Sequence, residues 1–150
     1  MYKRIAVAID GSKTSDAALD EAVKLAREMG ATLLLLHVCE EMPIAWEPDG
    51  MSMIPMDDIV KVIADAGKAL LERYRKRLAG QVAALETSLV ETYDGRVGNV
   101  ISEEARRWKA DLLVVGTHGR KGIDRLLLGN VAEGVSRSAS MPVLLVRAKD

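Results

Sequence analysis

The sequence lacks several features that would place it in a specialised class of proteins. It has one cysteine among 150 residues, Cys39, so it can form no internal disulfide and contains no C-x-x-C redox pair. Its longest nearly continuous apolar run, residues 31–38, is far too short to span a bilayer. The first residues run directly into a strand pattern instead of a signal peptide. We therefore expect a cytoplasmic protein with no membrane partner.

An excess of charge of one sign is also lacking. The chain has 21 Lys and Arg against 22 Asp and Glu, which gives a net charge of −1 at pH 7. Dedicated nucleic-acid-binding domains usually carry a strong basic excess, so we expect no nucleic-acid partner. A chain of 150 residues, 49% of them hydrophobic, is typical of one domain with a substantial core. We therefore expect a single domain over residues 1–150.

No motif for nucleophilic or metal-dependent catalysis is present. The chain has no G-x-S-x-G motif, and neither histidine is tied by a motif to a serine or cysteine. The soft metal-ligand candidates are His37, Cys39 and His118, and they lack the spacing of a zinc site. We predict no catalytic residue and no metal-binding residue.

Apolar runs alternate with helical periodicities along the chain. Residues 4–9 and 31–38 are continuously apolar, which is typical of parallel strands buried on both faces. The stretch between them follows helical spacing, with Thr14 or Ser15 as the expected N-cap and Gly30 as the C-terminal stop. The remaining expected elements are a helix from residue 57, a more alternating edge strand at 85–92, a helix near 97–108, and strands at 111–116 and 142–147 around a helix at 131–139.

This order of elements predicts the fold class. Five strands and about four helices in alternation are what a doubly wound α/β domain needs. We therefore predict a Rossmann-like five-stranded parallel sheet that binds its ligand at the carboxyl edge.

Residues 40–56 break the alternation. They include Pro43, Pro48, Pro55 and Trp46 together with four methionines, and they show no clean period. We interpret this segment as an irregular insertion over the carboxyl edge of the sheet. Its apolar residues could form a lid, a partner surface or ordinary packing onto the domain.

The glycines near the end of the chain suggest a phosphate-binding loop. Gly116, Gly119 and Gly129 follow the spacing G-x2-G-x9-G, and Asn130 comes next. The first two would let the backbone approach a ligand closely, and Gly129 would precede a helix whose first N–H groups are free to bind an anion. The alternative is that all three are ordinary turn and capping glycines.

Three stretches of sequence resemble the universal stress protein family. Residues 114–133, closed by residues 141–147, are similar to the family's C-terminal signature, and residues 5–12 are similar to its first strand and aspartate. The ATP-binding branch carries G-x2-G-x9-G followed by serine or threonine. Here Asn130 occupies that last position.

The resemblance implies an ATP-binding regulatory protein of the stress response, with Mg²⁺ as an optional companion of the ATP. It implies that Asp10 contacts the nucleoside, that Ala8 and Ile9 flank the base, and that the Val38 backbone contacts adenine. Arg120 would lie near the phosphates, and the alternative is that it belongs to a solvated loop face. The complete set implied for the nucleotide is Ala8, Ile9, Asp10, Val38, Val115, Gly116, Gly119, Arg120, Gly129, Asn130 and Val131. Two alternatives remain, a slow ATPase or phosphotransferase and a stress interaction module that binds no nucleotide.

Asn130 is the clear departure from the family pattern. Its amide NH₂ can donate to a phosphate oxygen, as a serine or threonine hydroxyl would. Asparagine is also about as good an N-cap as serine. We therefore expect Asn130 to preserve both the phosphate contact and the start of the helix.

The last strand, Pro142–Arg147, carries apolar residues on both faces. Such a strand at a sheet edge invites pairing with another chain. The resemblance implies a two-fold homodimer through this strand, in which Val143 and Leu145, or their neighbours of opposite parity, are buried. The sequence identifies no other protein partner and no stress signal.

Overall fold

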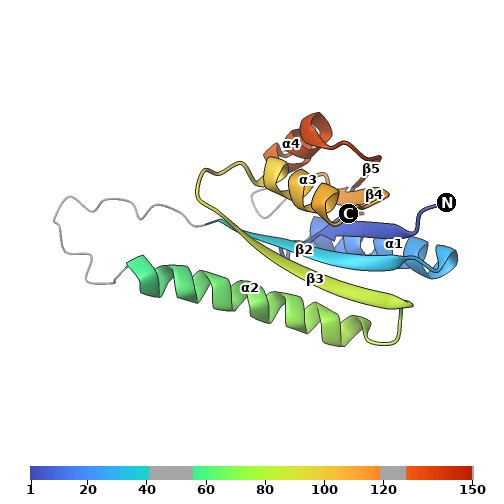
Figure 1. Ribbon diagram of the computed structural model, residues 1–150, viewed down its shortest axis with the longest axis horizontal. Helices are drawn as coiled ribbons and strands as arrows, with labels where there is room; N and C mark the ends of the chain where they lie inside the picture. Colours follow the sequence, from blue (N-terminus) through green and yellow to red (C-terminus); the bar gives the residue numbers. More distant parts are fainter. Residues whose placement is uncertain (41–55, 119–127, 150) are drawn as a thin grey trace.

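The computed structural model describes residues 1–40, 56–118 and 128–149. In these ranges the elements are β1 (Arg4–Ala8), α1 (Lys13–Met29), β2 (Thr32–Glu40), α2 (Met56–Leu78), β3 (Ala84–Thr92), α3 (Val97–Arg107), β4 (Leu112–Gly116), α4 (Asn130–Ser138) and β5 (Val143–Val146). The strands form one parallel sheet in the order β3-β2-β1-β4-β5, with helices on both sides (Figure 1). The predicted doubly wound α/β fold is confirmed. The alternating strand β3 lies at one edge, as predicted, and β5 lies at the other.

Both faces of the sheet are buried, which explains the continuously apolar strands. Ile5 and Leu33 belong to a core packed against α1 and α2, whereas their neighbours Ala6 and Leu34 belong to a second core packed against α3 and α4. All four side chains are at most 1% exposed. Successive residues of each central strand therefore stabilise opposite layers.

The first helix begins two or three residues earlier than the sequence pattern suggested. The N-cap is Ser12, whose hydroxyl accepts a hydrogen bond from the Ser15 N–H at 3.2 Å. The expected cap at Thr14 or Ser15 was wrong, because both residues lie inside α1. Gly30 ends the helix as predicted, with a left-handed φ of 63° that favours glycine.

The expected irregular segment at 40–56 is narrower at both ends. Glu40 is the last residue of β2 and Met56 is the first of α2. Residues 41–55 lie outside the described part of the chain. Within the described part, none of the helices is both long and apolar enough to cross a membrane.

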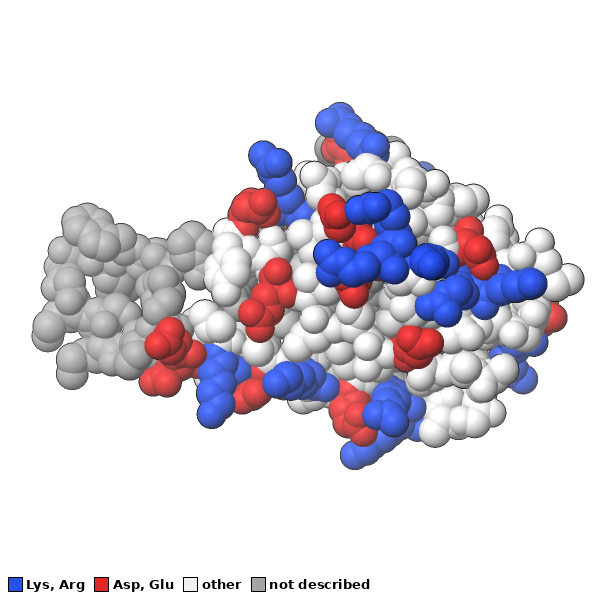
Figure 2. All heavy atoms as spheres, in the orientation of Figure 1, with Lys and Arg blue, Asp and Glu red and all other residues white. Residues whose placement is uncertain are grey.

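The charged surface mixes both signs. On the face drawn in Figure 2, basic and acidic side chains lie interspersed. Pairs such as Lys24–Glu21 and Arg106–Glu103 are spaced three residues apart on exposed helix faces. Exposed pairs of this kind contribute little to stability, so the fold depends on its two apolar cores.

A buried tyrosine joins α1 to α2. The Tyr74 hydroxyl donates to the Asp16 carboxylate, and the Tyr74 side chain is 4% exposed. Burial, followed by the hydrogen bond to Asp16 and the charge of Asp16, raises the pKa of Tyr74 to about 12. Arg73 and Arg77 act in the opposite direction and lower this pKa.

The raised pKa predicts a loss of stability in alkaline solution. Because the pKa of Tyr74 is higher in the folded state than its ordinary value of 10.0, its contribution is complete below pH 10 and is lost as the pH rises to about 12. We expect the free energy of unfolding to fall by roughly 2 kcal/mol over this window. Urea unfolding of Tyr74→Phe should lack this part of the fall, whereas the exposed Tyr93→Phe should retain it. The same pH dependence in wild type and Tyr74→Phe would contradict the assignment.

Candidate nucleotide-binding site

A pocket lies at the carboxyl edge of the sheet, where β1 and β4 are neighbours. The helix that follows β1 covers one face of the sheet, and the helix between β4 and β5 covers the other. The two connections therefore leave in opposite directions and open a crevice between them. Its lining residues are Ala8, Ile9, Asp10, Ser15, Leu36, Val38, Val97, Ile101, Val115, Gly116, Thr117, His118, Gly129, Val131 and Ala132.

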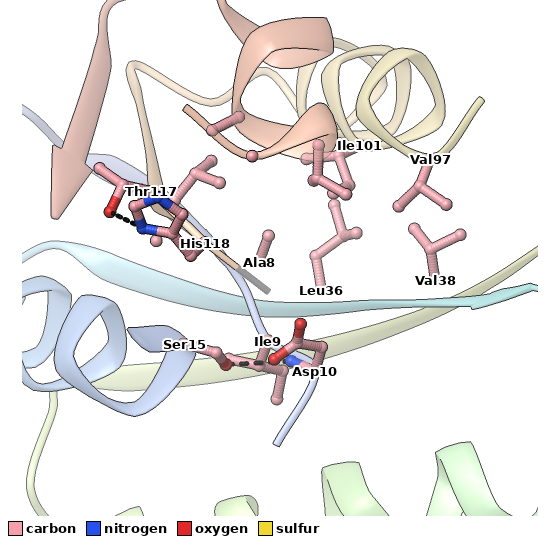
Figure 3. Close-up of a pocket in the computed structure, with 15 residues that line it drawn as sticks. Ala8, Ile9, Asp10, Ser15, Leu36, Val38, Val97, Ile101, Thr117 and His118 are labelled. Carbon is pink, nitrogen blue, oxygen red and sulfur yellow. Dashed lines mark hydrogen bonds between the residues drawn. The ribbon is translucent and has the colours of Figure 1, made fainter. Parts of the chain in front are cut away.

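Most of the pocket is an apolar slot. In Figure 3, Leu36 and Val38 of β2 face Ile101 and Val97 of α3, with Ala8 beside them. Leu36 and Ile101 are buried, whereas Val38, Val97 and Ala8 are half-buried and still accessible from the pocket. A slot between aliphatic side chains suits a flat, weakly polar group such as a nucleobase.

An ordered carboxylate stands at the rim of the slot. Asp10 directly follows the end of β1, where its Oδ1 accepts from the Ser12 N–H at 2.9 Å. Its own N–H donates to the Ser15 hydroxyl at 3.0 Å. Ser15 lies in the first turn of α1 and is 5% exposed, so its hydrogen bond ties the turn after β1 to the helix. The start of α1 thus fixes the position of the Asp10 carboxylate, which remains half-buried beside the pocket.

His37 supports the same end of β1 from the other face of the sheet. Its Nδ1 lies 2.7 Å from the Ile9 carbonyl oxygen, so the proton on this nitrogen is donated to the backbone. The Cys39 Sγ lies 3.7 Å from the Ile63 carbonyl oxygen of α2. The described residues contain no group of three His, Cys, Asp or Glu that could hold a metal ion.

Thr117 connects three elements around the other side of the pocket. Its N–H donates to the Val146 carbonyl of β5 at 2.9 Å, and its carbonyl accepts from the Gly129 N–H at 2.8 Å. Its hydroxyl lies 3.0 Å from Nδ1 of His118, which lines the pocket (Figure 3). The end of β4 and the start of α4 are therefore joined directly by hydrogen bonding.

Gly129 is the N-cap residue of α4, and it has a structural reason to be glycine. A Cβ at this position would lie 2.9 Å from the Thr117 carbonyl oxygen. Glycine has no side chain with which to cap the helix, and the first internal hydrogen bond runs from the Glu133 N–H to the Gly129 carbonyl. The N–H groups of residues 130–132 thus have no acceptor within the helix, as at any helix N-terminus.

Asn130 does not occupy the expected cap position. It is the first residue of α4, it is exposed, and it is not among the residues that line the pocket. The predicted capping role was therefore wrong, because the cap position is taken by Gly129.

Gly116 also has a packing role that the glycine spacing did not indicate. A Cβ there would lie 2.8 Å from Thr14 Cγ2 and 2.9 Å from the Thr14 carbonyl oxygen. Gly116 lines the pocket, but its missing side chain makes room for α1.

The structure brings together most of the residues that the sequence suggested. The pocket includes Ala8, Ile9, Asp10, Val38, Val115, Gly116, Gly129 and Val131. Gly119 and Arg120 lie outside the described residues. The residues not included in the predicted set are Ser15, Leu36, Val97, Ile101, Thr117, His118 and Ala132. Of these, Val97 and Ile101 lie in the helix predicted near 97–108, and periodicity cannot distinguish a pocket wall from a core.

Residues 1–147 match the sequence model of the universal stress protein family. The chain belongs to that family. It is 34% identical over 151 residues to universal stress protein YxiE of Bacillus subtilis, covering 98% of this chain and 100% of that protein. It is 33% identical over 147 residues to universal stress protein MJ0531 of Methanocaldococcus jannaschii, covering 98% of this chain and 83% of that protein.

Solved structures show the same fold. The hypothetical protein MJ0577 superposes with a TM-score of 0.82 and 25% identity, covering 100% of this chain and 99% of that one. A universal stress protein in complex with cAMP superposes with a TM-score of 0.60 and 28% identity, covering 99% and 98% of the two chains.

The contact between Gly129 and Thr117 predicts a cost for any side chain at Gly129. The backbone of Gly129, with φ −62° and ψ 154°, is accessible to alanine, so the cost of Gly129→Ala comes from the crowded carbonyl. We expect a loss of about 1–3 kcal/mol of unfolding free energy, measured by urea denaturation. Asn130→Ala is the matched control at the exposed neighbouring position, with an expected change within about 0.5 kcal/mol. Equal stability of the two variants would show that the contact is unimportant.

Proposed function

We propose that this universal stress protein binds an adenine nucleotide, ATP in particular, as a regulatory ligand. The observation that carries the proposal is the arrangement of the pocket. An apolar slot, a fixed carboxylate and the N-terminus of α4 all meet at the carboxyl edge of the sheet.

Each part of the pocket suits one part of the nucleotide. The base would lie in the slot between β2 and α3, near Ala8 and Val38. The Asp10 carboxylate would accept hydrogen bonds from ribose hydroxyls. The N–H groups in the first turn of α4 would donate to phosphate oxygens, with the helix dipole favouring negative charge.

Two further points support an adenine nucleotide as the ligand. A structural neighbour that is 28% identical to this chain was solved in complex with cAMP, which shares the adenine, the ribose and one phosphate with ATP. The spacing of Gly116, Gly119 and Gly129 is that of the ATP-binding branch of the family. Any Mg²⁺ would arrive with the triphosphate. A regulatory role is favoured over ATP hydrolysis because no motif ties a catalytic base to an attacking water.

The slot predicts that a larger side chain at Ala8 blocks binding. Nucleotide released from the denatured purified protein is first identified by chromatography, and we expect ATP or another adenine nucleotide. Calorimetry should then show ATP binding to nucleotide-free wild type and a loss of at least about tenfold in Ala8→Leu, because the new side chain fills the place of the base.

Ala84→Leu makes the same chemical change at the exposed first residue of β3. This residue lies at the amino ends of the parallel strands, whereas the pocket lies at their carboxyl ends. The variant should bind ATP as wild type does. Undiminished ATP binding by Ala8→Leu would place the base elsewhere, and wild type that binds no adenine nucleotide would favour the nucleotide-free interaction module.

We also propose a two-fold homodimer through β5. This strand lies at the sheet edge, and Leu145 is 37% exposed although it belongs to an apolar strand. Pairing with a second copy would bury this side chain and satisfy the open edge.

The dimer predicts a change of mass when the edge becomes charged. Wild type should scatter light as a dimer at micromolar concentration, and Leu145→Glu should scatter as a monomer because the charge cannot be buried in the pairing. Val62→Glu places the same charge on α2, where the residue is 67% exposed, and should remain dimeric. A monomeric wild type, with or without ATP, would exclude the dimer.

A further inference from the structure

The two helices beside the slot touch through their backbones. Gly98 of α3 is buried, and a Cβ there would lie 2.7 Å from the Val131 carbonyl oxygen of α4. It would also lie 2.9 Å from Gly134 Cα and from the Val135 nitrogen. All three neighbours are backbone atoms, which cannot rotate away as the end of a side chain can. Only glycine lets α3 lie this close to α4.

Serine hydroxyls extend the same contact by one helical turn. Ser102, which is 4% exposed, donates to the Gly98 carbonyl at 3.0 Å. The Ser138 hydroxyl of α4 lies 2.8 Å from the Ser102 oxygen and 2.7 Å from the Gly134 carbonyl oxygen. Residues four apart share one helix face, so each helix presents a glycine and a serine to the other. The contact fixes how far apart the helices lie.

The same helical turns carry the walls of the slot. Val97 and Ile101 directly precede Gly98 and Ser102, and both line the pocket (Figure 3). On α4, the residue whose carbonyl faces Gly98 is Val131, which itself lines the pocket. A change in the distance between the helices therefore moves the pocket walls contributed by α3 and α4 relative to each other.

We propose that Gly98 is a positioning residue of the nucleotide pocket. By allowing the backbone contact between α3 and α4, it sets the distance between the pocket walls that these two helices contribute. It is not one of the residues that line the pocket, and it acts through Val97, Ile101 and Val131. The proposal rests on the proposed function, because the spacing of these walls matters through the base that the pocket holds.

The test is the ATP affinity of Gly98→Ala, measured by calorimetry on the full chain. The added Cβ must move from 2.7 Å to at least 3.4 Å from the Val131 oxygen, the distance at which ordinary contact begins. A shift of this size between the α3 and α4 walls opens a gap beside the base and removes a substantial part of its dispersion contact with them, so we expect about tenfold weaker binding of ATP.

Two further variants separate positioning from general destabilisation. Leu78→Ala removes a side chain that is 3% exposed at the end of α2, the helix that precedes β3. Leu78 does not line the pocket. This variant should lower the Tm and leave the ATP affinity unchanged. Gly134→Ala is a milder change in the same contact, since its Cβ would lie 3.3 Å from Gly98 Cα. Its ATP affinity should fall between those of wild type and Gly98→Ala.

Unchanged ATP affinity in folded Gly98→Ala would overturn the proposal, as would an equal loss in Leu78→Ala. If Gly98→Ala does not fold, Gly134→Ala decides, and an affinity equal to that of wild type overturns the proposal. A wild type that binds no adenine nucleotide contradicts the proposed function instead. The two failures are distinguishable, because the binding of wild type is measured before any variant is compared with it.

Discussion

The burial of both sheet faces is the constraint on which the rest of the structure depends. Ile5, Leu33, Ala6 and Leu34 are almost completely inaccessible, so helices must cover the sheet on each side. Right-handed connections then require the chain to leave β1 toward one face and β4 toward the other. The crevice between these connections follows from the covering of the core. The candidate site therefore exists because of the topology, before any ligand-binding residue is considered.

Hydrogen bonds within the chain hold the polar groups of the crevice in place. The turn after β1 is held by Ser12 and Ser15, and this places the Asp10 carboxylate at the rim. The turn after β4 is held by Val146 and Gly129 through the backbone of Thr117. A site whose groups are already ordered loses less conformational entropy on binding. The described part of the pocket is preorganised in this sense.

The sequence was sufficient for the fold because its periodicities were strong. Continuous apolar runs identified the central strands, and the weaker alternation at 85–92 correctly indicated an edge. The N-cap of α1 was missed because Ser12, Thr14 and Ser15 are all chemically suitable, and only the course of the backbone selects Ser12.

The candidate site could be predicted only in part. Residues that follow a strand, such as Asp10 and Val115, are recognisable from their place at the carboxyl edge. Val97 and Ile101 were not assigned to the site, because an apolar stripe on a helix is the same whether it faces a core or a pocket. The reasons for glycine at Gly116 and Gly129 were also hidden. The crowding atoms belong to Thr14 and Thr117, and only the folded chain brings them close.

The bond from the Thr117 N–H to the Val146 carbonyl has a practical consequence for handling the protein. The last strand ends beside Thr117, which lines the pocket, so a fusion partner attached after residue 150 begins only a few residues from that bond. Met1 is 97% exposed and precedes the start of β1, so it lies at the amino ends of the strands, whereas the pocket lies at their carboxyl ends (Figure 1). An affinity tag or fluorophore for binding measurements therefore belongs at the amino terminus, where it leaves the pocket and the β5 edge undisturbed.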